Sequence, residues 1–230
     1  IRSYAWMALY RADMPLTEKM KKYLQRTLVS TERLINLVND MLNVSRIESG
    51  RLEIAPQAMD LQNLVGEVLV EIDAKAKEKN LHVENAAVHI PQVFADPNKV
   101  HQIMLNLLGN SLKFTKNAGS IKITYFCDGN FVYVSIHDDG VGIARDDVPR
   151  LFKKFSRLDN SYVAASSTGG TGLGLFICKS LVELMKGQIK VESEGENRGT
   201  TFTFSLPVAT SKVLEEAEKY HYKPEGEARL

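Results

Sequence analysis

In the stretch VHQIMLNLLGNSLKFT, residues 100–115, polar side chains recur at three- and four-residue steps among apolar ones. In an α-helix, where successive residues are rotated by about 100°, four polar side chains fall on one narrow stripe: Gln102, Asn106, Asn110 and Lys113. Apolar side chains flank this stripe on both sides. A polar face in bulk solvent would be wider and would carry charge along its centre. The pattern therefore predicts a helix whose polar stripe forms the floor of a cleft.

The side chains of this stripe suit a metal-bound phosphate. Amide oxygens are ligands for hard cations, and Mg²⁺ takes few protein ligands besides phosphate oxygens and water. Lys113 adds a point charge for a phosphate group. The alternative is that Asn106 and Asn110 make hydrogen bonds inside the protein, and the helix alone leaves both interpretations open.

The neighbouring segments predict an α+β fold, with a sheet layer covered by helices. Asp96 and Pro97 provide the N-cap and first residue of the helix. We expect a hairpin at 120–139 that turns at Asp128-Gly129. The other expected elements are helices at about 61–79 and after residue 173, and strands at 81–86, 92–95, 187–193 and 199–207.

Asp138 ends the second strand of the expected hairpin. Strand alternation places it on the same face as Val132, Val134 and Ile136, so its carboxylate should point toward the interior. A buried carboxylate requires hydrogen-bond donors, and the exocyclic amine of a purine is a suitable one. The alternative is that Asp138 caps the loop DDGVGI internally, as Asp before Gly often does.

The stretch TGGTGLGLFI, residues 168–177, combines glycines with the start of an apolar helix. Such a sequence indicates either a hinge or a place where a phosphate approaches backbone amides at a helix start. We expect Phe152 and Phe155 to lie on one helical turn and anchor a loop. The small, polar residues 156–170 predict a mobile lid, with Lys153, Lys154 and Arg157 positioned to reach a phosphate.

Residues 1 to about 48 predict an antiparallel helical hairpin that turns near Pro15, with apolar residues at three- and four-residue spacing. Two helices bury little apolar surface, so we expect a homodimer in which two hairpins form a four-helix bundle. The alternative is that the hairpin packs on its own chain. Gly50 and Pro56 mark the joint that follows.

Composition excludes several classes of function. A net charge of +1 argues against a nucleic-acid partner or contact with an anionic membrane. Cys127 and Cys178 lie far apart and match no metal-ligand spacing. No apolar run is long enough to span a bilayer, so we expect a cytoplasmic location, with any membrane anchor of the parent protein outside this chain.

Four stretches, in this order, resemble the ATP-binding domain of sensor histidine kinases. HQIMLNLLGNSLKFT resembles the N box of that family, DDGVGI its first glycine box, LFKKF its F box and GGTGLGL its second glycine box. The upstream STERLINLVNDMLNVSRIESGRLEI resembles the second helix of the dimerisation hairpin and the joint after it. The resemblance implies a two-layer α/β sandwich of the Bergerat type at 51–208, after a hairpin at 1–50 and before a charged tail at 209–230.

The resemblance also assigns roles by position. It implies ATP and Mg²⁺ as cofactors, with Asn110 on the metal, Asn106 beside it, Lys113 on phosphate and Asp138 on the adenine amine. The remaining residues implied to contact ATP are Phe114, Gly140, Gly142, Arg157, Gly170, Thr171, Gly172, Leu173 and Gly174. A response-regulator receiver domain is the implied partner.

Two features set this chain apart from related proteins. Similar ATP hydrolases carry a glutamate where this chain has Asn106, and a neutral amide is not a general base, which favours phosphoryl transfer to a side chain. The family's phospho-acceptor is a histidine in the first hairpin helix, and none of the five histidines here lies in residues 1–50. We therefore expect a kinase core without its acceptor, and no autophosphorylation of this fragment. The alternative is a non-catalytic, ATP-binding, dimerising module.

Overall fold

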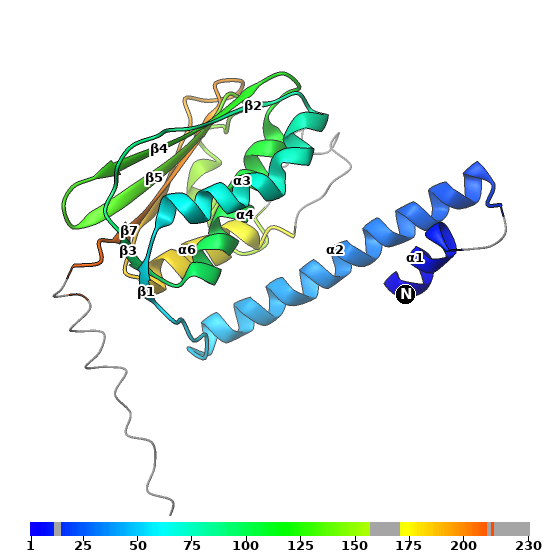
Figure 1. Cartoon of the computed structure of the whole chain (residues 1–230), viewed down its shortest axis with the longest axis horizontal. Coiled ribbons are helices and arrows are strands. Elements are labelled where there is room, and N and C mark those ends of the chain that lie inside the picture. The colour runs from blue at the N-terminus through cyan, green and yellow to red at the C-terminus, as the bar shows by residue number, and fades with distance from the viewer. Residues whose placement is uncertain (12–14, 157–170, 211–212, 214–230) are drawn as a thin grey trace, which may run out of the picture. The chain divides into compact units, whose positions relative to one another are not determined.

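The computed structural model describes residues 1–11, 15–156, 171–210 and 213. The chain divides into two compact units, Ile1–Leu52 and Glu53–Leu230, both of which are drawn in Figure 1. Each unit has its own architecture. None of the helices in the described ranges is both long and apolar enough to cross a membrane.

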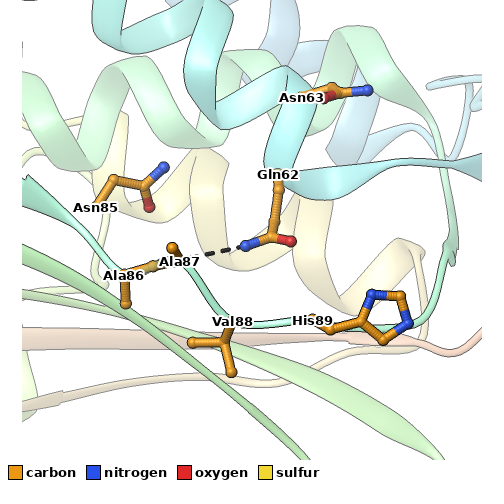
Figure 2. A pocket seen from close by; sticks show the side chains of 7 residues that line it. All are labelled: Gln62, Asn63, Asn85, Ala86, Ala87, Val88 and His89. Carbon is orange, nitrogen blue, oxygen red and sulfur yellow. Dashed lines mark hydrogen bonds between the residues drawn. The ribbon is translucent and has the colours of Figure 1, made fainter.

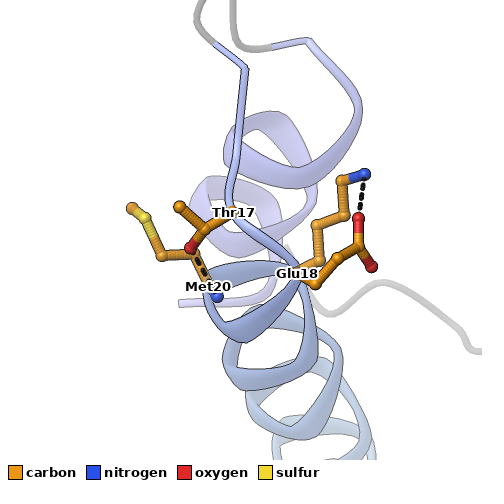
Figure 3. Close-up of polar contacts among 4 residues, drawn as sticks. Thr17, Glu18 and Met20 are labelled. Atoms are coloured by element: carbon orange, nitrogen blue, oxygen red, sulfur yellow. Dashed lines mark hydrogen bonds and ion pairs between the residues drawn. The ribbon is translucent and has the colours of Figure 1, made fainter.

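The first unit is a pair of helices, α1 (Arg2–Tyr10) and α2 (Glu18–Glu48), which pack against each other. Thr17 caps α2, because its Oγ1 accepts a hydrogen bond from the backbone N–H of Met20 at 3.3 Å (Figure 3). Glu18 lies in the first turn, where its charge complements the helix dipole, and it pairs with Lys21 at 2.8 Å. The predicted helical hairpin is therefore confirmed.

The second unit is a five-stranded sheet with helices packed on it (Figure 1). The strand order is β2-β4-β5-β7-β6, with β2 parallel to β4 and the other pairs antiparallel. The strands are β2 (His82–Asn85), β4 (Ser120–Cys127), β5 (Phe131–Asp138), β6 (Ile189–Glu192) and β7 (Thr200–Pro207). The helices are α3 (Leu61–Glu78), α4 (Pro97–Phe114) and α6 (Gly174–Leu184). A small antiparallel pair, β1 (Gln57–Met59) and β3 (Val93–Ala95), lies outside the main sheet. The predicted α+β fold with a two-layer sandwich is confirmed.

The core lies between the helices and one face of the sheet. Strand alternation buries Ile123, Val134 and Phe204 completely, and the helices bury Ile103 and Leu107 against them. Removing side chains of this size from water stabilises the fold by about 1.5–3 kcal/mol each. This packing holds α4 firmly on the sheet, so that the polar stripe of α4 has a fixed position.

The loop between β4 and β5 differs from the predicted two-residue turn. It contains three residues, Asp128, Gly129 and Asn130. The reason is the Asp128 carboxylate, whose Oδ1 accepts hydrogen bonds from the backbone N–H groups of Asn130 and Phe131 at 2.9 and 2.8 Å. Gly129 takes a φ of +97°, which a larger side chain would resist.

The expected helical turn with Phe152 and Phe155 as anchors is wrong. After a short 3₁₀ helix, η1 (Val148–Arg150), the chain makes separate tight turns, and Phe155 is 59% exposed with a φ of +56°. A Cβ on Gly172 would lie 2.9 Å from the carbonyl carbon of Phe155. The close approach of these two backbones, rather than an aromatic anchor, defines the local structure.

Candidate nucleotide site

Helix α4 begins at an N-cap that also ties it to a preceding segment. Asp96 Oδ1 accepts hydrogen bonds from the backbone N–H groups of Asn98 and Lys99 at 2.9 and 3.2 Å, and its Oδ2 accepts one from Ala55 at 2.9 Å. Pro97 occupies the first helical position, as predicted. The start of the helix is thus fixed from two sides.

The polar stripe of α4 lies at the boundary of the core. Asn106, Asn110 and Lys113 are half-buried, whereas their neighbours Leu107 and Leu108 are fully buried. Lys113 extends over the ring of Phe114, with its Nζ 4.8 Å from the ring centroid. The stripe is therefore neither a fully solvated face nor part of the core, which fits the floor of a cleft.

Asp138, at the end of β5, is buried with 3% of its surface exposed. Its Oδ2 accepts a hydrogen bond from Ser111 Oγ at 3.0 Å, and its Oδ1 accepts one from the backbone N–H of Gly140 at 3.1 Å. Burial raises the pKa of the Asp138 carboxyl above its ordinary value, and the bonds from Ser111 and Gly140 oppose this shift in part. The prediction that this side chain points inward is confirmed.

Ser111 is a residue of this site that the sequence analysis missed. It is fully buried on the apolar face of α4, in line with Met104, Leu107 and Leu108. A lone hydroxyl among apolar residues at helical spacing needs a buried partner. That interruption of the apolar face was the signal, and the partner is Asp138.

The loop after Asp138 packs closely against the end of α4. Gly140 has no room for a side chain, because a Cβ there would lie 2.6 Å from the carbonyl oxygen of Phe114. The backbone N–H of Val141 donates to that same oxygen at 3.2 Å. Gly142 has a φ of +66°, and a methyl group there would overlap the carbonyl oxygen of Gly195. These contacts bring Phe114, Gly140 and Gly142 together beside Asp138.

The start of α6 lies against the polar stripe. A Cβ on Gly174, the first residue of α6, would be 3.0 Å from the Asn106 side-chain oxygen. Gly172 has a φ of +72°, and Thr171 Oγ1 accepts a hydrogen bond from the backbone N–H of Leu173 at 3.2 Å. The Leu173 side chain is fully buried, so it belongs to the core. The structure thus brings the second glycine box and the N box together.

Two predicted site residues, Arg157 and Gly170, lie outside the described residues, as do residues 157–170 of the expected lid. Of the lysines expected to reach a phosphate, Lys154 places its Nζ 5.0 Å from the centroid of the Phe176 ring. Phe176 belongs to the first turn of α6. Lys154 is therefore near the glycine-rich helix start, where it lies over an aromatic ring.

The donor set fits a metal that arrives with phosphate. Within the described ranges, no group of three or more His, Cys, Asp or Glu residues could hold an ion by itself. Asn110 offers one amide oxygen in a half-buried position, and Mg²⁺ is commonly held by one or two protein ligands plus substrate phosphates. The residues present thus fit nucleotide-bound Mg²⁺ and not a metal cage made of protein alone.

Two histidines near the site have partners elsewhere. His101 places its Nε2 2.6 Å from Glu71 Oε1 on α3, and His137 places its Nδ1 2.9 Å from Thr201 Oγ1 on the outer face of the sheet. Neither of these rings hydrogen-bonds to a residue of the polar stripe in the described structure. They are poorly placed to act on a group held by Asn110.

A separate, shallow hollow of about 410 Å³ lies between the start of α3 and the segment after β2 (Figure 2). It is lined by Gln62, Asn63, Asn85, Ala86, Ala87, Val88 and His89. Gln62 Nε2 donates a hydrogen bond to the carbonyl oxygen of Ala86 at 3.5 Å. None of the predicted site residues lines this hollow, so it is distinct from the candidate site.

Comparison with known proteins places this arrangement in a family. Residues 95–210 match the family described as histidine kinase-, DNA gyrase B- and HSP90-like ATPase, and residues 1–50 match the His kinase A (phospho-acceptor) domain. The circadian input-output histidine kinase CikA of Synechococcus elongatus is 36% identical over 199 residues, which cover 85% of this chain and 26% of CikA. This chain belongs to the sensor histidine kinase family.

Solved histidine kinase structures share the fold. Full-length ShkA in complex with AMPPNP superposes with a TM-score of 0.75 at 31% identity, over 91% of this chain and 43% of ShkA. Histidine kinase ThkA in complex with the response regulator TrrA superposes with a TM-score of 0.66 at 24% identity, over 90% of this chain and 57% of ThkA. The chain spans about a quarter of the length of CikA, 26%.

Proposed function

We propose that this chain is the kinase core of a two-component sensor. It binds Mg-ATP between α4, the loop after Asp138 and the start of α6, and it transfers the γ-phosphoryl group to a histidine on a dimerisation hairpin. From there the phosphoryl group passes to an aspartate of a response regulator. The observation that carries this proposal is the buried Asp138 carboxylate beside a half-buried amide stripe and a glycine-rich helix start.

The Asp138 carboxylate is the proposed acceptor for the adenine amine. Each of its oxygens already accepts one hydrogen bond, from Ser111 or from Gly140. A carboxylate oxygen has two lone-pair positions, so an acceptor position remains for a ligand. The exocyclic amine of adenine donates hydrogen bonds, whereas guanine presents a carbonyl oxygen at the corresponding position. Gly140, Gly142 and Phe114 would line the base.

The polar stripe and the second glycine box are the proposed phosphate side of the site. Asn110 would hold Mg²⁺ that arrives with the nucleotide, and the metal would neutralise charge on the phosphates. Asn106 lies beside Gly174, and Lys113 supplies a positive charge. Thr171, Gly172 and the backbone of Leu173 would frame the triphosphate, and Arg157 and Gly170 are assigned to the same end by their position in the family's motifs.

Asn106 favours transfer of the phosphoryl group over hydrolysis. A general base must accept a proton from the attacking water, and the Asn106 amide has no basic group that does so. A histidine acceptor needs no such base, because its neutral ring nitrogen has a free electron pair. The protein's task is then to hold the γ-phosphate in line with an incoming imidazole.

We propose two partners for this chain, a second copy of itself and a response regulator. Residues 1–50 would form a homodimer with a second hairpin, because α2 leaves several apolar side chains exposed: Val29, Leu34, Ile35, Val38, Met41 and Leu42. A response-regulator receiver domain is the proposed recipient of the phosphoryl group, and the similar histidine kinase ThkA forms a complex with the response regulator TrrA. We propose residues 51–208 as the catalytic domain and 209–230 as a tail. We also propose a cytoplasmic location for this core, because ATP is its proposed substrate.

Calorimetry and phosphotransfer together test the proposal. We expect Mg-ATP to bind to the chain, and γ-labelled ATP to label a histidine-containing dimerisation hairpin supplied as a separate protein. Label on that hairpin should be acid-labile and stable to base, as expected of phosphohistidine. Release of free phosphate in place of a labelled hairpin, or an absence of ATP binding, would contradict the proposal.

A further inference from the structure

The loop between β6 and β7, residues 193–199, contacts the loop that follows Asp138. Ser193 makes the central connection: its Oγ accepts hydrogen bonds from the backbone N–H of Ile143 at 3.0 Å and of Gly195 at 3.4 Å. The same hydroxyl donates to the carbonyl oxygen of Gly199 at 2.7 Å. One half-buried side chain therefore closes its own loop and holds the far end of the segment 140–143.

Backbone hydrogen bonds add two more connections between these loops. The N–H of Asn197 donates to the carbonyl oxygen of Val141 at 2.6 Å, and the N–H of Gly199 donates to that of Gly140 at 3.2 Å. Asn197 in turn accepts a hydrogen bond from Lys116 Nζ at 3.0 Å on its side-chain oxygen. The loop 193–199 thus holds residues 140, 141 and 143, and is itself fastened to the segment after α4.

At Gly142 and Gly199 the backbones themselves approach closely, with no room for a side chain. A methyl group on Gly142 would overlap the carbonyl oxygen of Gly195, and one on Gly199, where φ is +73°, would overlap the carbonyl oxygen of Asp138. Such close packing leaves segment 140–143 little freedom to move on its own. Its conformation depends on the loop 193–199 keeping its shape.

The conformation of segment 140–143 affects the proposed adenine site at Asp138 directly. Gly140 donates one of the two hydrogen bonds on the Asp138 carboxylate, at 3.1 Å. Loss of the connection at Ile143 would loosen the loop that places this donor and would let the carboxylate reorient. Within the described residues, Ser193 itself makes no hydrogen bond to Asp138 or to a residue of the polar stripe.

We propose that Ser193 is a positioning residue for nucleotide binding: through Ile143 and Gly199 its hydroxyl holds the loop 140–143 in the form that receives the adenine base. This inference rests on the proposed function. Its effect should fall on the affinity for ATP, because the connection reaches the base side of the site and not Asn110 or Lys113. The spacing Ser-x-Gly-x-x-x-Gly at 193–199 is the sequence pattern that accompanies this contact.

The test compares three variants of the chain by calorimetry with Mg-ATP. Ser193→Ala should raise the Kd about five- to tenfold, which corresponds to the loss of one hydrogen bond to a neighbouring loop. Ser193→Thr keeps the hydroxyl and should restore most of the affinity. Ser205→Ala is the matched control: Ser205 Oγ also accepts from a backbone N–H, that of Gln188 at 3.0 Å, but it lies five residues beyond Thr200 on β7.

The control variant Ser205→Ala distinguishes an effect of Ser193 on the position of the loop 140–143 from an effect on the stability of the fold. Ser193→Ala and Ser205→Ala should lower the urea midpoint by similar amounts, whereas only Ser193→Ala should weaken ATP binding and speed hydrogen exchange at Val141 and Ile143. An unchanged Kd in Ser193→Ala, or an equal loss of affinity in both variants, overturns the inference. If Ser193→Ala does not fold, Ser193→Cys replaces it, because a thiol of similar size is a poor acceptor. Failure of the wild-type chain to bind ATP would instead refute the proposed function.

Discussion

Burial raises the pKa of the Asp138 carboxyl above its ordinary value of 3.8. The folded chain therefore holds this proton at pH values where the unfolded chain has released it, so stability falls as pH rises from about 3.8 through the raised pKa. Asp138→Asn removes this titration. We expect the unfolding free energy of wild type, relative to Asp138→Asn, to decline over that pH window in urea titrations. A difference that rises with pH, or does not change, would contradict the assignment of a raised pKa.

The same substitution should weaken nucleotide binding while the fold remains intact. An asparagine keeps one acceptor oxygen but replaces the other by an amino group, which cannot accept from Ser111 or from adenine. A hydrogen bond to a charged group is worth about 1.5–3 kcal/mol, so the Kd for Mg-ATP should rise at least tenfold by calorimetry. Asp139→Asn serves as the control, because Asp139 Oδ2 instead accepts from the backbone N–H and the hydroxyl of Ser120, each at 2.9 Å. An equal effect of both variants would argue against Asp138 as the base contact.

At the scale of elements, Lys79 stabilises the end of α4 that carries the polar stripe. Its Nζ, at the C-terminal end of α3, donates to the carbonyl oxygens of Leu112 at 2.7 Å and of Thr115, which have no helical partner of their own. Its charge also complements the negative end of the α4 dipole. Lys79→Met should lower the unfolding free energy by about 1–3 kcal/mol in urea titrations.

The control for Lys79→Met is Lys77→Met, two residues earlier on α3. Lys77 pairs with Asp73 at 2.6 Å, but its side chain is 77% exposed. Exposed pairs of this kind contribute about 0–1 kcal/mol, so Lys77→Met should have a small effect. Hydrogen exchange at the last turn of α4 should become faster in Lys79→Met alone. Comparable destabilisation by both variants would show that Lys79 acts only as a surface charge.

The prediction of a dimer rests on the exposed apolar side chains of α2. Leu34, Val38 and Leu42 follow four-residue steps on one face and are 57%, 47% and 52% exposed in the single chain. Val38→Glu would place a charge in the centre of an apolar helix interface and should shift the chain toward monomer in sedimentation. Asn36→Glu, on the opposite face of the helix, should leave the oligomeric state unchanged. A wild-type chain that is monomeric at all concentrations would contradict the dimer.

At the scale of the whole molecule, the features that the sequence predicted are those encoded by neighbouring residues. The N-cap of α4 and the inward direction of Asp138 follow from spacing within one element, and the α+β class follows from the order of such elements along the chain. The contacts of Ser111 with Asp138 and of Ser193 with Ile143 join positions 27 and 50 residues apart. Pairings of this kind depend on how strands and loops meet in three dimensions, so a local pattern such as the lone hydroxyl of Ser111 indicates a buried partner without identifying it. The helical turn expected at Phe152 and Phe155 is wrong in a segment that also has a distant contact, because the Phe155 backbone lies against that of Gly172.

The distribution of histidines leads to a prediction for the chain as a whole. Residues 1–50 match the phospho-acceptor domain but contain no histidine, and the five histidines of the chain are His82, His89, His101, His137 and His221. His101 is the obvious candidate for a substitute because it opens the N box, yet its ring pairs with Glu71 on α3 at 2.6 Å, and in-line transfer requires the acceptor to face the γ-phosphate. With Mg-ATP and no added acceptor, the chain should therefore bind nucleotide without acquiring acid-labile phosphate. Calorimetry on the same preparation provides the positive control for nucleotide binding. Acid-labile label that maps to any of these five histidines would refute the prediction, and label on His101 would require α4 to expose that ring to the nucleotide.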